Sequence, residues 1–234
     1  MDVGNMKTVL IAKQKGGVGA TTCARELAVA AAGAGLTVAI ADLDPQRTLT
    51  RWWSRRQTAA PLADGAQPNP ALLGVPVAEV PSALAQLARG GVDLAILDTP
   101  PGMHPLVLGL ARHADLALCP TRPTTDDLEA LATLLPALGG APMAFVVTQA
   151  PSRSRLYDEA VRLLAQQGRV APPIRYRQDY PAAAAEGRAA CESASSKAAE
   201  EIADLWRWLM ETGLALRPAS QDAMTPGRKQ WRRA

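Results

Sequence analysis

The chain has 234 residues, 48% of them hydrophobic, and a formal net charge of +3, which suits one medium-sized folded domain and excludes a mainly disordered chain. No run approaches the ~20 apolar residues that span a bilayer, and the first residues lack the basic start and apolar run of a secretory signal. Three widely spaced cysteines, Cys23, Cys119 and Cys191, form neither a disulfide framework nor a CxxC metal site and favour a reducing cytoplasm.

Short apolar strands alternate with longer helices from residue 7 onward. Strands are predicted at residues 7–13, 37–42, 75–80, 92–98, 114–119, 143–148 and 170–175. Helices are predicted at residues 20–34, 48–56, 81–89, 104–113, 125–138, 154–167 and 195–211, with a surface loop at 59–74 and a turn before the last helix. Strands that are apolar throughout are typical of a parallel sheet covered by helices on both faces. The pattern predicts a single α/β domain at residues 1–216, with a doubly wound, mostly parallel sheet, and a flexible basic tail at 217–234.

The strongest local signal is LIAKQKGGVGATT at residues 10–22, which follows a strand and opens a helix. Its three glycines let the backbone approach phosphate oxygens, and successive N–H groups at the helix N-terminus can hold their charge. Thr21 is placed to offer a hydroxyl to Mg²⁺, and Thr22 to offer one to a phosphate. The alternative is an ordinary glycine turn, which the acids at the ends of later strands argue against.

Three aspartates stand at or just after the ends of apolar strands. Asp42 and Asp44 lie at the end of the second predicted strand, and Asp98 ends the strand at 92–98. In doubly wound folds, ligands bind at the carboxyl ends of the strands. Carboxylates placed there can hold Mg²⁺ or orient an attacking water, whereas the structural alternative is capping of the turns that follow.

Three motifs in order carry a resemblance to a known family. KGGVGATT at residues 15–22 resembles the deviant Walker A motif, KGGxGK(T/S)T, of the ParA/MinD ATPases. DLDPQ at 42–46 is similar to the family's Walker A′ segment, and VDLAILDTPPG at 92–102 to its Walker B strand. Two more segments match, ADLALCPTRPTTDDLEAL at 114–131 and YRQDYPAAAAEG…SSKAAEEI at 176–202, so that the resemblance covers about residues 6–212. It implies a P-loop NTPase fold of the deviant Walker A type, with ATP and Mg²⁺ as ligands.

The resemblance also implies roles for individual residues. The nucleotide is expected at Lys15, Gly16, Gly17, Val18, Gly19, Ala20, Thr21 and Thr22. Lys15 is the family's signature lysine, which reaches the partner's nucleotide across an ATP-sandwich homodimer, and Asp44 matches the acid that orients the attacking water. These two residues are the expected catalytic pair. Mg²⁺ is expected at Thr21, Asp42 and Asp98.

The chain departs from the family at position 20, where Ala20 stands in place of the lysine that reaches the β- and γ-phosphates. A charge-assisted hydrogen bond contributes ~1.5–3 kcal/mol, so its loss alone weakens nucleotide binding about 10–150-fold. We therefore expect impaired ATP binding and little or no hydrolysis. An engineered change and natural degeneration, as in relatives that resemble TadZ and BcsQ, both explain Ala20. Lys13 could partly compensate, although a lysine at a strand end is more often solvated.

Basic residues gather in two segments. Residues 151–178 hold six arginines against two acids, and residues 217–234 hold five basic residues against one aspartate. Such clusters bind duplex DNA through its phosphates without reading its sequence, while the alternative is a solvated helix face. The expected DNA contacts are Arg153, Arg155 and Arg175 from this charge pattern, together with Arg177 and Lys197, which align with the family's nonspecific DNA contacts.

The sequence thus favours a cytoplasmic, nucleoid-associated ParA-like ATPase for DNA partition, plasmid segregation or cargo positioning. It would act as a nucleotide-dependent homodimer on nonspecific DNA, with a ParB-like adaptor that stimulates hydrolysis. One alternative is a non-hydrolysing scaffold, which Ala20 favours. Another is a membrane-associated MinD-like protein, which needs a C-terminal amphipathic helix that residues 215–234 do not show, so no stable membrane association is expected. Nitrogenase-like iron proteins need two cluster cysteines, which Cys119 alone does not supply.

Overall fold

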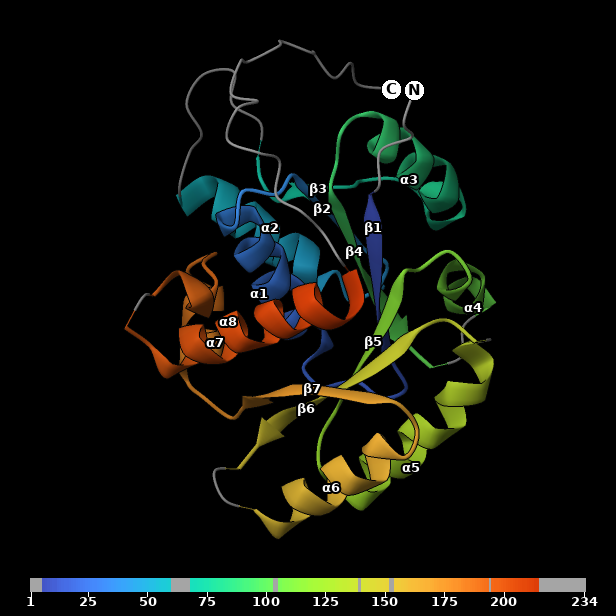
Figure 1. Ribbon diagram of the computed structural model, residues 1–234. Coiled ribbons are helices and arrows are strands. Elements are labelled where there is room, and N and C mark those ends of the chain that lie inside the picture. The colour runs from blue at the N-terminus through green and yellow to red at the C-terminus, as the bar shows by residue number, and fades with distance from the viewer. Residues whose placement is uncertain are drawn as a thin grey trace.

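The computed structural model describes residues 6–59, 68–102, 105–138, 140–151, 154–193 and 195–214. Within them the chain forms a seven-stranded sheet in the order β3-β2-β4-β1-β5-β6-β7, and every neighbouring pair of strands is parallel (Figure 1). The predicted doubly wound α/β fold is confirmed. The predicted tail at 217–234 lies outside the described residues.

The strands and helices alternate along the chain as the apolar pattern predicts. The strands are β1 (Lys7–Lys13), β2 (Val38–Asp42), β3 (Ala71–Leu72), β4 (Leu94–Pro101), β5 (Leu116–Thr121), β6 (Met143–Ala150) and β7 (Arg169–Arg175). The helices are α1 (Ala20–Gly33), α2 (Thr48–Ala59), α3 (Val80–Arg89), α4 (Pro105–Ala111), α5 (Thr125–Leu134), α6 (Arg155–Ala165), α7 (Asp179–Ala185) and α8 (Lys197–Leu209). No helix in these described ranges combines the length and the apolar character that crossing a membrane requires.

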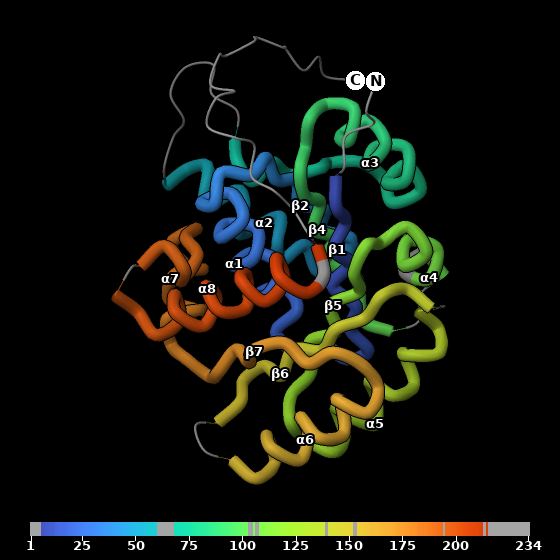
Figure 2. The backbone as a smooth tube through the Cα atoms, in the orientation of Figure 1, coloured from blue at the N-terminus to red at the C-terminus, as the bar shows by residue number. Residues whose placement is uncertain are grey.

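Alternate residues of the strands supply two hydrophobic cores, one on each face of the sheet. Val9 and Ile11 of β1 belong to the core formed with α1, α2, α7 and α8, whereas Leu10 and Ala12 belong to the core formed with α3, α4, α5 and α6. The two groups of helices lie on opposite sides of the sheet (Figure 2). Because both faces are covered, both sets of strand residues are apolar, which explains the continuous apolar runs in the sequence.

The structure corrects two predicted elements. The strand predicted at 75–80 is wrong, since that segment holds a short 3-10 turn and the start of α3, and β3 lies instead within the predicted surface loop. Pro76 cannot donate to a strand ladder, and β3 pairs with β2 at only two positions, too few to leave a pattern. The turn predicted before the last helix also contains α7. Pro181 is tolerated there because it occupies the first turn of the helix, where N–H groups have no intrahelical partner.

In the strand order, β1 lies in the middle of the sheet. The sheet grows from β1 through β4 and β2 in one direction and through β5, β6 and β7 in the other. A crevice therefore forms at the carboxyl end of β1, where connections depart to opposite faces, and this is where doubly wound folds bind ligands.

Candidate functional site

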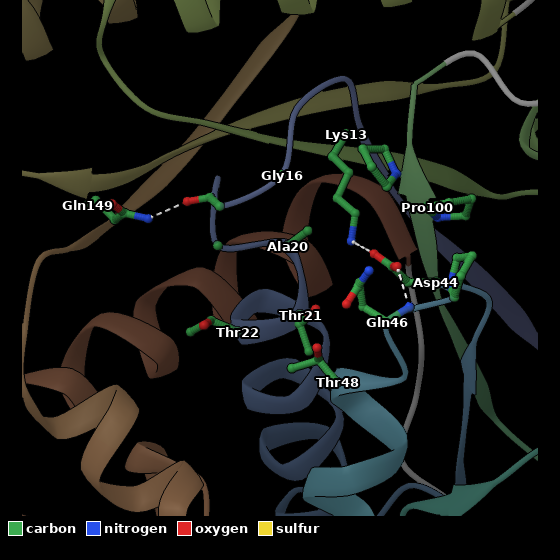
Figure 3. A pocket seen from close by; sticks show the side chains of 14 residues that line it. Lys13, Gly16, Ala20, Thr21, Thr22, Asp44, Gln46, Thr48, Pro100 and Gln149 are labelled. Atoms are coloured by element: carbon green, nitrogen blue, oxygen red, sulfur yellow. Dashed lines mark hydrogen bonds and ion pairs between the residues drawn. The ribbon is translucent and has the colours of Figure 1, made fainter.

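A cavity of about 680 Å³ opens at the carboxyl end of β1, and Figure 3 shows the residues that line it. They come from the end of β1 and the loop that follows it, the first turn of α1, the segment from β2 to the start of α2, and the ends of β4 and β6. Segments far apart in the sequence thus meet here. The volume lies within the range of cavities that bind small organic ligands.

The loop between β1 and α1 has the backbone of an anion cradle. Gly17 and Gly19 have φ values of 77° and 78°, a conformation that residues with a Cβ atom rarely adopt. Gly19 is also the N-cap of α1 and makes no side-chain cap hydrogen bond. The N–H groups of the first helical turn are therefore available to an acceptor, and the positive end of the helix dipole favours an anion.

Two residues at the end of β6 hold this loop in place. The hydroxyl of Thr148 donates to the carbonyl oxygen of Val18 at 2.7 Å, and the amide of Gln149 donates to that of Gly17, also at 2.7 Å. Sequence reasoning missed both residues. The available signal was the same as for the aspartates, because Thr148 and Gln149 lie near the end of a strand that is apolar up to residue 147.

Lys13 is buried inside the cavity, so the prediction that favoured a solvated lysine is wrong. Lys13 as a whole is only 5% exposed to solvent. Its Nζ lies 2.9 Å from Oδ2 of Asp44 and 3.1 Å from Oδ1 of Asp98. The side chain leaves the end of β1 and extends across the cavity toward Asp44 (Figure 3). A lysine can be buried in this way only because two carboxylates compensate its charge.

Asp98 of β4 is fully buried and contacts two residues that line the cavity, Lys13 and Thr21. One of its oxygens accepts from Lys13, and the other accepts from the hydroxyl of Thr21 at 2.6 Å. Burial raises the pKa of Asp98 above its ordinary value, although Lys13 and Thr21 both favour the carboxylate. The predicted pair of Thr21 and Asp98 is therefore in direct contact.

Asp44 has the opposite electrostatic balance. Burial favours its neutral form, but the hydrogen bond from the backbone N–H of Gln46 and the ion pair with Lys13 outweigh burial, so that the pKa of Asp44 lies below its ordinary value. Asp44 is thus held as a carboxylate at the wall of the cavity, a state suited to accepting a proton or orienting a water.

Asp42 lies beside Asp98 in the neighbouring strand, but its carboxylate points to backbone groups. One oxygen accepts from the N–H of Asp44 at 3.2 Å and the other from the N–H of Thr50 at 2.7 Å. Both contacts tie the end of β2 to the turn and to α2. In this structure Asp42 shapes the segment that carries Asp44.

Lys15 and Ala20 lie differently with respect to the cavity. Lys15 is exposed, is not among the residues that line the cavity, and donates to the backbone carbonyl oxygen of Asp126 at 2.9 Å. Ala20 is buried and lines the cavity together with Lys13. The loop therefore presents a methyl group to the cavity at the position where the resembled motif has a lysine.

Two of the predicted DNA-contacting residues lie exposed at the starts of helices. Arg155 begins α6, and Lys197 begins α8. Arg153, which the same prediction named, lies outside the described residues.

The other two, Arg175 and Arg177, lie at or just after the end of β7, where Glu201 of α8 holds them. A guanidinium nitrogen of Arg177 lies 2.6 Å from Oε1 of Glu201, and Nε of Arg175 lies 3.9 Å from the same oxygen. Arg175 also stacks over the ring of Tyr157, 5.7 Å from its centroid. These two arginines therefore offer less uncompensated positive charge than Arg155 and Lys197 do.

The side chains of the site suit a metal ion that is bound by the protein and by a ligand together. Across the described part of the chain, no group of three or more His, Cys, Asp or Glu side chains is arranged to hold a metal ion. Mg²⁺ is usually bound by one or two carboxylates together with substrate phosphates and waters rather than by an all-protein cage. The contacting oxygens of Thr21 and Asp98, at the mouth of an anion cradle, fit that kind of site.

Comparisons with known proteins agree with this geometry. The model of the CobQ/CobB/MinD/ParA nucleotide binding domain matches residues 9–190. The chain is 34% identical over 153 residues to the chromosome-partitioning ATPase Soj of Thermus thermophilus, covering 57% of this chain and 61% of Soj. It is 39% identical over 127 residues to maintenance of carboxysome distribution protein A of Gloeobacter kilaueensis, covering 53% of each. The matches thus span between about half and three fifths of these relatives.

Solved structures share the fold. The MinC:MinD cell division complex of Aquifex aeolicus superposes with a TM-score of 0.73 at 18% identity, covering 90% of this chain and 98% of that one. A plasmid partition protein of Borrelia burgdorferi bound to AMPPNP gives a TM-score of 0.69 at 17% identity, covering 88% of this chain and 99% of that one. At these identities the likeness establishes the architecture alone.

Proposed function

The chain belongs to the CobQ/CobB/MinD/ParA nucleotide-binding family, and on this premise we propose that it binds ATP with Mg²⁺ in the cavity at the end of β1. The observation that carries the proposal is the loop of residues 16–19, whose two left-handed glycines open onto the N-terminus of α1 beside the contact of Thr21 with Asp98. A cradle of N–H groups suits phosphates, and the adjacent oxygens suit the cation that accompanies them.

Each residue of the site has a proposed role. The N–H groups of residues 17–21 would bind phosphate oxygens, and Thr21 and Asp98 would hold Mg²⁺. When bound, Mg²⁺ would neutralise the negative charge that develops on the phosphoryl oxygens. Asp44 orients the attacking water, and Lys15 leaves the carbonyl of Asp126 to reach the nucleotide of a second copy of the chain.

A second cavity of about 200 Å³ extends the site toward β7. It shares Gly19, Thr22 and Gln149 with the larger cavity, and its other lining residues are Thr148, Ile174, Arg175, Tyr176, Arg177, Tyr180 and Pro181. Apolar and aromatic side chains together with a few polar groups, next to a phosphate cradle, suit the flat base of a nucleotide. We assign this cavity to the adenine ring.

We propose that the nucleotide acts as a switch for positioning a cargo on DNA rather than as fuel for rapid turnover. Without a lysine at position 20, hydrolysis is slow or absent. The two relatives named above are a chromosome-partitioning protein and a carboxysome-distribution protein, which supports cargo positioning as the general role. A nucleotide-dependent homodimer, nonspecific DNA and a ParB-like adaptor complete the proposal.

The test is DNA binding with and without nucleotide. Fluorescence anisotropy of a random-sequence duplex, measured across a salt series, should show binding that ATP and Mg²⁺ strengthen. In the double variant R155A/K197A, affinity should fall and the slope of log K against log salt should flatten by about 0.9 for each lost phosphate contact.

A matched double variant, R89A/R112A, removes two arginines that are also exposed but lie on or just after α3 and α4. It should retain the native affinity and slope. An equal loss in both double variants would mean that only net charge matters, and no binding of DNA at low salt, together with binding to anionic liposomes, would favour a membrane-associated protein instead.

A further inference from the structure

Two features of the cavity are linked although the sequence places them seven residues apart. Ala20 brings no charge to the phosphate loop, and Lys13 brings a buried ammonium group into the same cavity. Its Nζ lies 2.9 Å from Asp44 and 3.1 Å from Asp98. The cavity therefore holds a lysine that enters from the end of β1 instead of from the first turn of α1.

The geometry of the ammonium group leaves it able to bind a further acceptor. A lysine ammonium has three N–H donors. Two of them are directed to Asp44 and Asp98, and the third remains for an oxygen in the cavity. Lys13 can therefore bind an anion without breaking either ion pair.

Charge balance supports the same conclusion. Asp44 lines a cavity whose glycine loop is built for an anion, and the buried Asp98 contacts the lining residues Lys13 and Thr21, so that uncompensated carboxylates there would repel a phosphate. A lysine between them reduces that repulsion and adds attraction. Among the residues that the structure describes, the cavity thus contains one lysine from its own chain. A lysine at position 20, in the absence of Lys13, would give the same number.

We propose that Lys13 is the phosphate-binding cation of this site and takes over the task that position 20 cannot perform. This inference rests on the proposed function, because it concerns the same cavity and the same nucleotide. It predicts that the chain binds nucleoside triphosphates despite Ala20, and that Lys13 contributes to binding the outer phosphates rather than the nucleoside.

The test is a double-mutant cycle over Lys13→Met and Ala20→Lys, with the dissociation constants of ATP and AMP measured by calorimetry in Mg²⁺. K13M should weaken ATP at least tenfold and leave AMP within about threefold. Adding A20K to K13M should recover at least tenfold in ATP affinity, whereas A20K in the native background should gain only a few-fold, because one cation already serves the phosphates.

Several controls separate phosphate binding from folding. The ratio of the ATP and AMP constants within one variant does not depend on the competent fraction of the protein, since partial unfolding weakens both alike. Lys13→Gln keeps donors for the two carboxylates but removes the charge, and should repeat the K13M result. Lys7→Met makes the same substitution at the other end of β1, where Lys7 pairs with Asp115, and should leave both constants unchanged.

The outcomes are distinguishable. If native protein binds ATP and K13M binds it equally well, or if K13M weakens ATP and AMP by the same factor, the role of Lys13 is overturned while the proposed function stands. If native protein binds neither ATP nor AMP, both are overturned.

Discussion

Several charged side chains are buried, and their hydrogen bonds and ion pairs connect different elements of the fold. Glu26 of α1 is fully buried, yet its carboxylate accepts from Nε of Arg25 at 3.2 Å and from the backbone N–H groups of Ala190 and Cys191, both at 3.1 Å. Asp98 is similarly surrounded by donors. Each buried carboxylate is therefore stabilised in place by its partners, and removing one partner would leave an expensive uncompensated charge.

Asp127, in the first turn of α5, allows this principle to be measured. Its carboxylate accepts from Nε of Arg122 at 2.7 Å and from the hydroxyl of Thr124 at 2.6 Å. Burial alone would raise the pKa of Asp127, but these donors outweigh burial and hold it below its ordinary value. A lowered folded-state pKa stabilises the fold above the ordinary pKa, about 4, and that stability is lost as pH falls through the folded-state value.

We expect Asp127→Asn to lower the free energy of unfolding by about 1–2 kcal/mol at pH 7, since Arg122 is partly exposed and its ion pair partly screened. Urea unfolding from pH 7 to pH 2 should show the difference from native protein shrinking below about pH 4. Asp126→Asn, in the exposed neighbour, is the control and should leave the curve unchanged. A difference between D127N and native protein that is constant with pH would contradict the assigned cause.

Part of the candidate site could be predicted residue by residue. The positions of Thr21 in the loop and of Asp98 at a strand end predict that the two lie near each other, and their side chains are in contact. The sequence does not predict that Lys13 is buried, because the general avoidance of burial by lysine says nothing about two carboxylates that converge on it, Asp98 from β4 and Asp44 from the segment after β2. Such compensation depends on contacts between segments 31 and 85 residues apart, which no local pattern encodes.

At the level of elements, the turn after α7 packs against α2 with almost no space between the backbones. Gly187 has a φ of 72°, and a Cβ placed on it would lie 2.6 Å from the carbonyl carbon of Arg55 and would also meet the backbone nitrogen of Arg56. The contact is reinforced by the indole of Trp52, which donates to the carbonyl oxygen of Arg188 at 3.0 Å. Glycine is therefore required at position 187 both for its conformation and for the close approach.

Gly187→Ala should lower the free energy of unfolding by about 2–5 kcal/mol, because the left-handed conformation costs ~1–2 kcal/mol and overpacking ~1–3 kcal/mol. Gly91→Ala is the matched control, since Gly91 has a φ of 84° but open space where the Cβ would stand. It should cost only the ~1–2 kcal/mol of the left-handed conformation. Equal losses in urea unfolding of the two variants would mean that the packing against α2 is not tight.

The elements that the sequence predicts well are those with a long apolar run. Strands β1, β4, β5 and β6 are buried along most of their length and lie close to their predicted ranges. The two-residue β3 and the alanine-rich α7 have no such run. They exist because neighbouring elements hold them, β3 by pairing with β2 and α7 by packing beside α2, so their positions depend on the completed fold.

At the scale of the whole molecule, the sheet brings the ends of several strands, and the loops that follow them, together at one edge. The phosphate loop follows β1, Asp44 follows β2, Asp98 lies in β4, and Thr148 and Gln149 lie in β6. Strand order alone decides that these segments meet. The fold class therefore follows from the alternating pattern, and the place of the site follows from the fold class.

Charge is also distributed at this scale. Behind the net charge of +3 stand a cavity lined by Lys13 and Asp44 and exposed basic residues at the starts of α6 and α8. In the proposed function, the cavity binds the nucleotide and the exposed cations bind a polyanion. The proposed switch on DNA requires both surfaces at once.

A crystal structure of the native chain with Mg²⁺ and a non-hydrolysable ATP analogue tests the central claim most directly, namely that the cavity binds nucleotide despite Ala20. The account predicts phosphate oxygens at about 2.7–3.2 Å from N–H groups of residues 17–21 and from Nζ of Lys13, with the base between Ile174 and Pro181. An analogue bound elsewhere, or a cavity that stays free of it in crystals grown at millimolar analogue, would contradict the account.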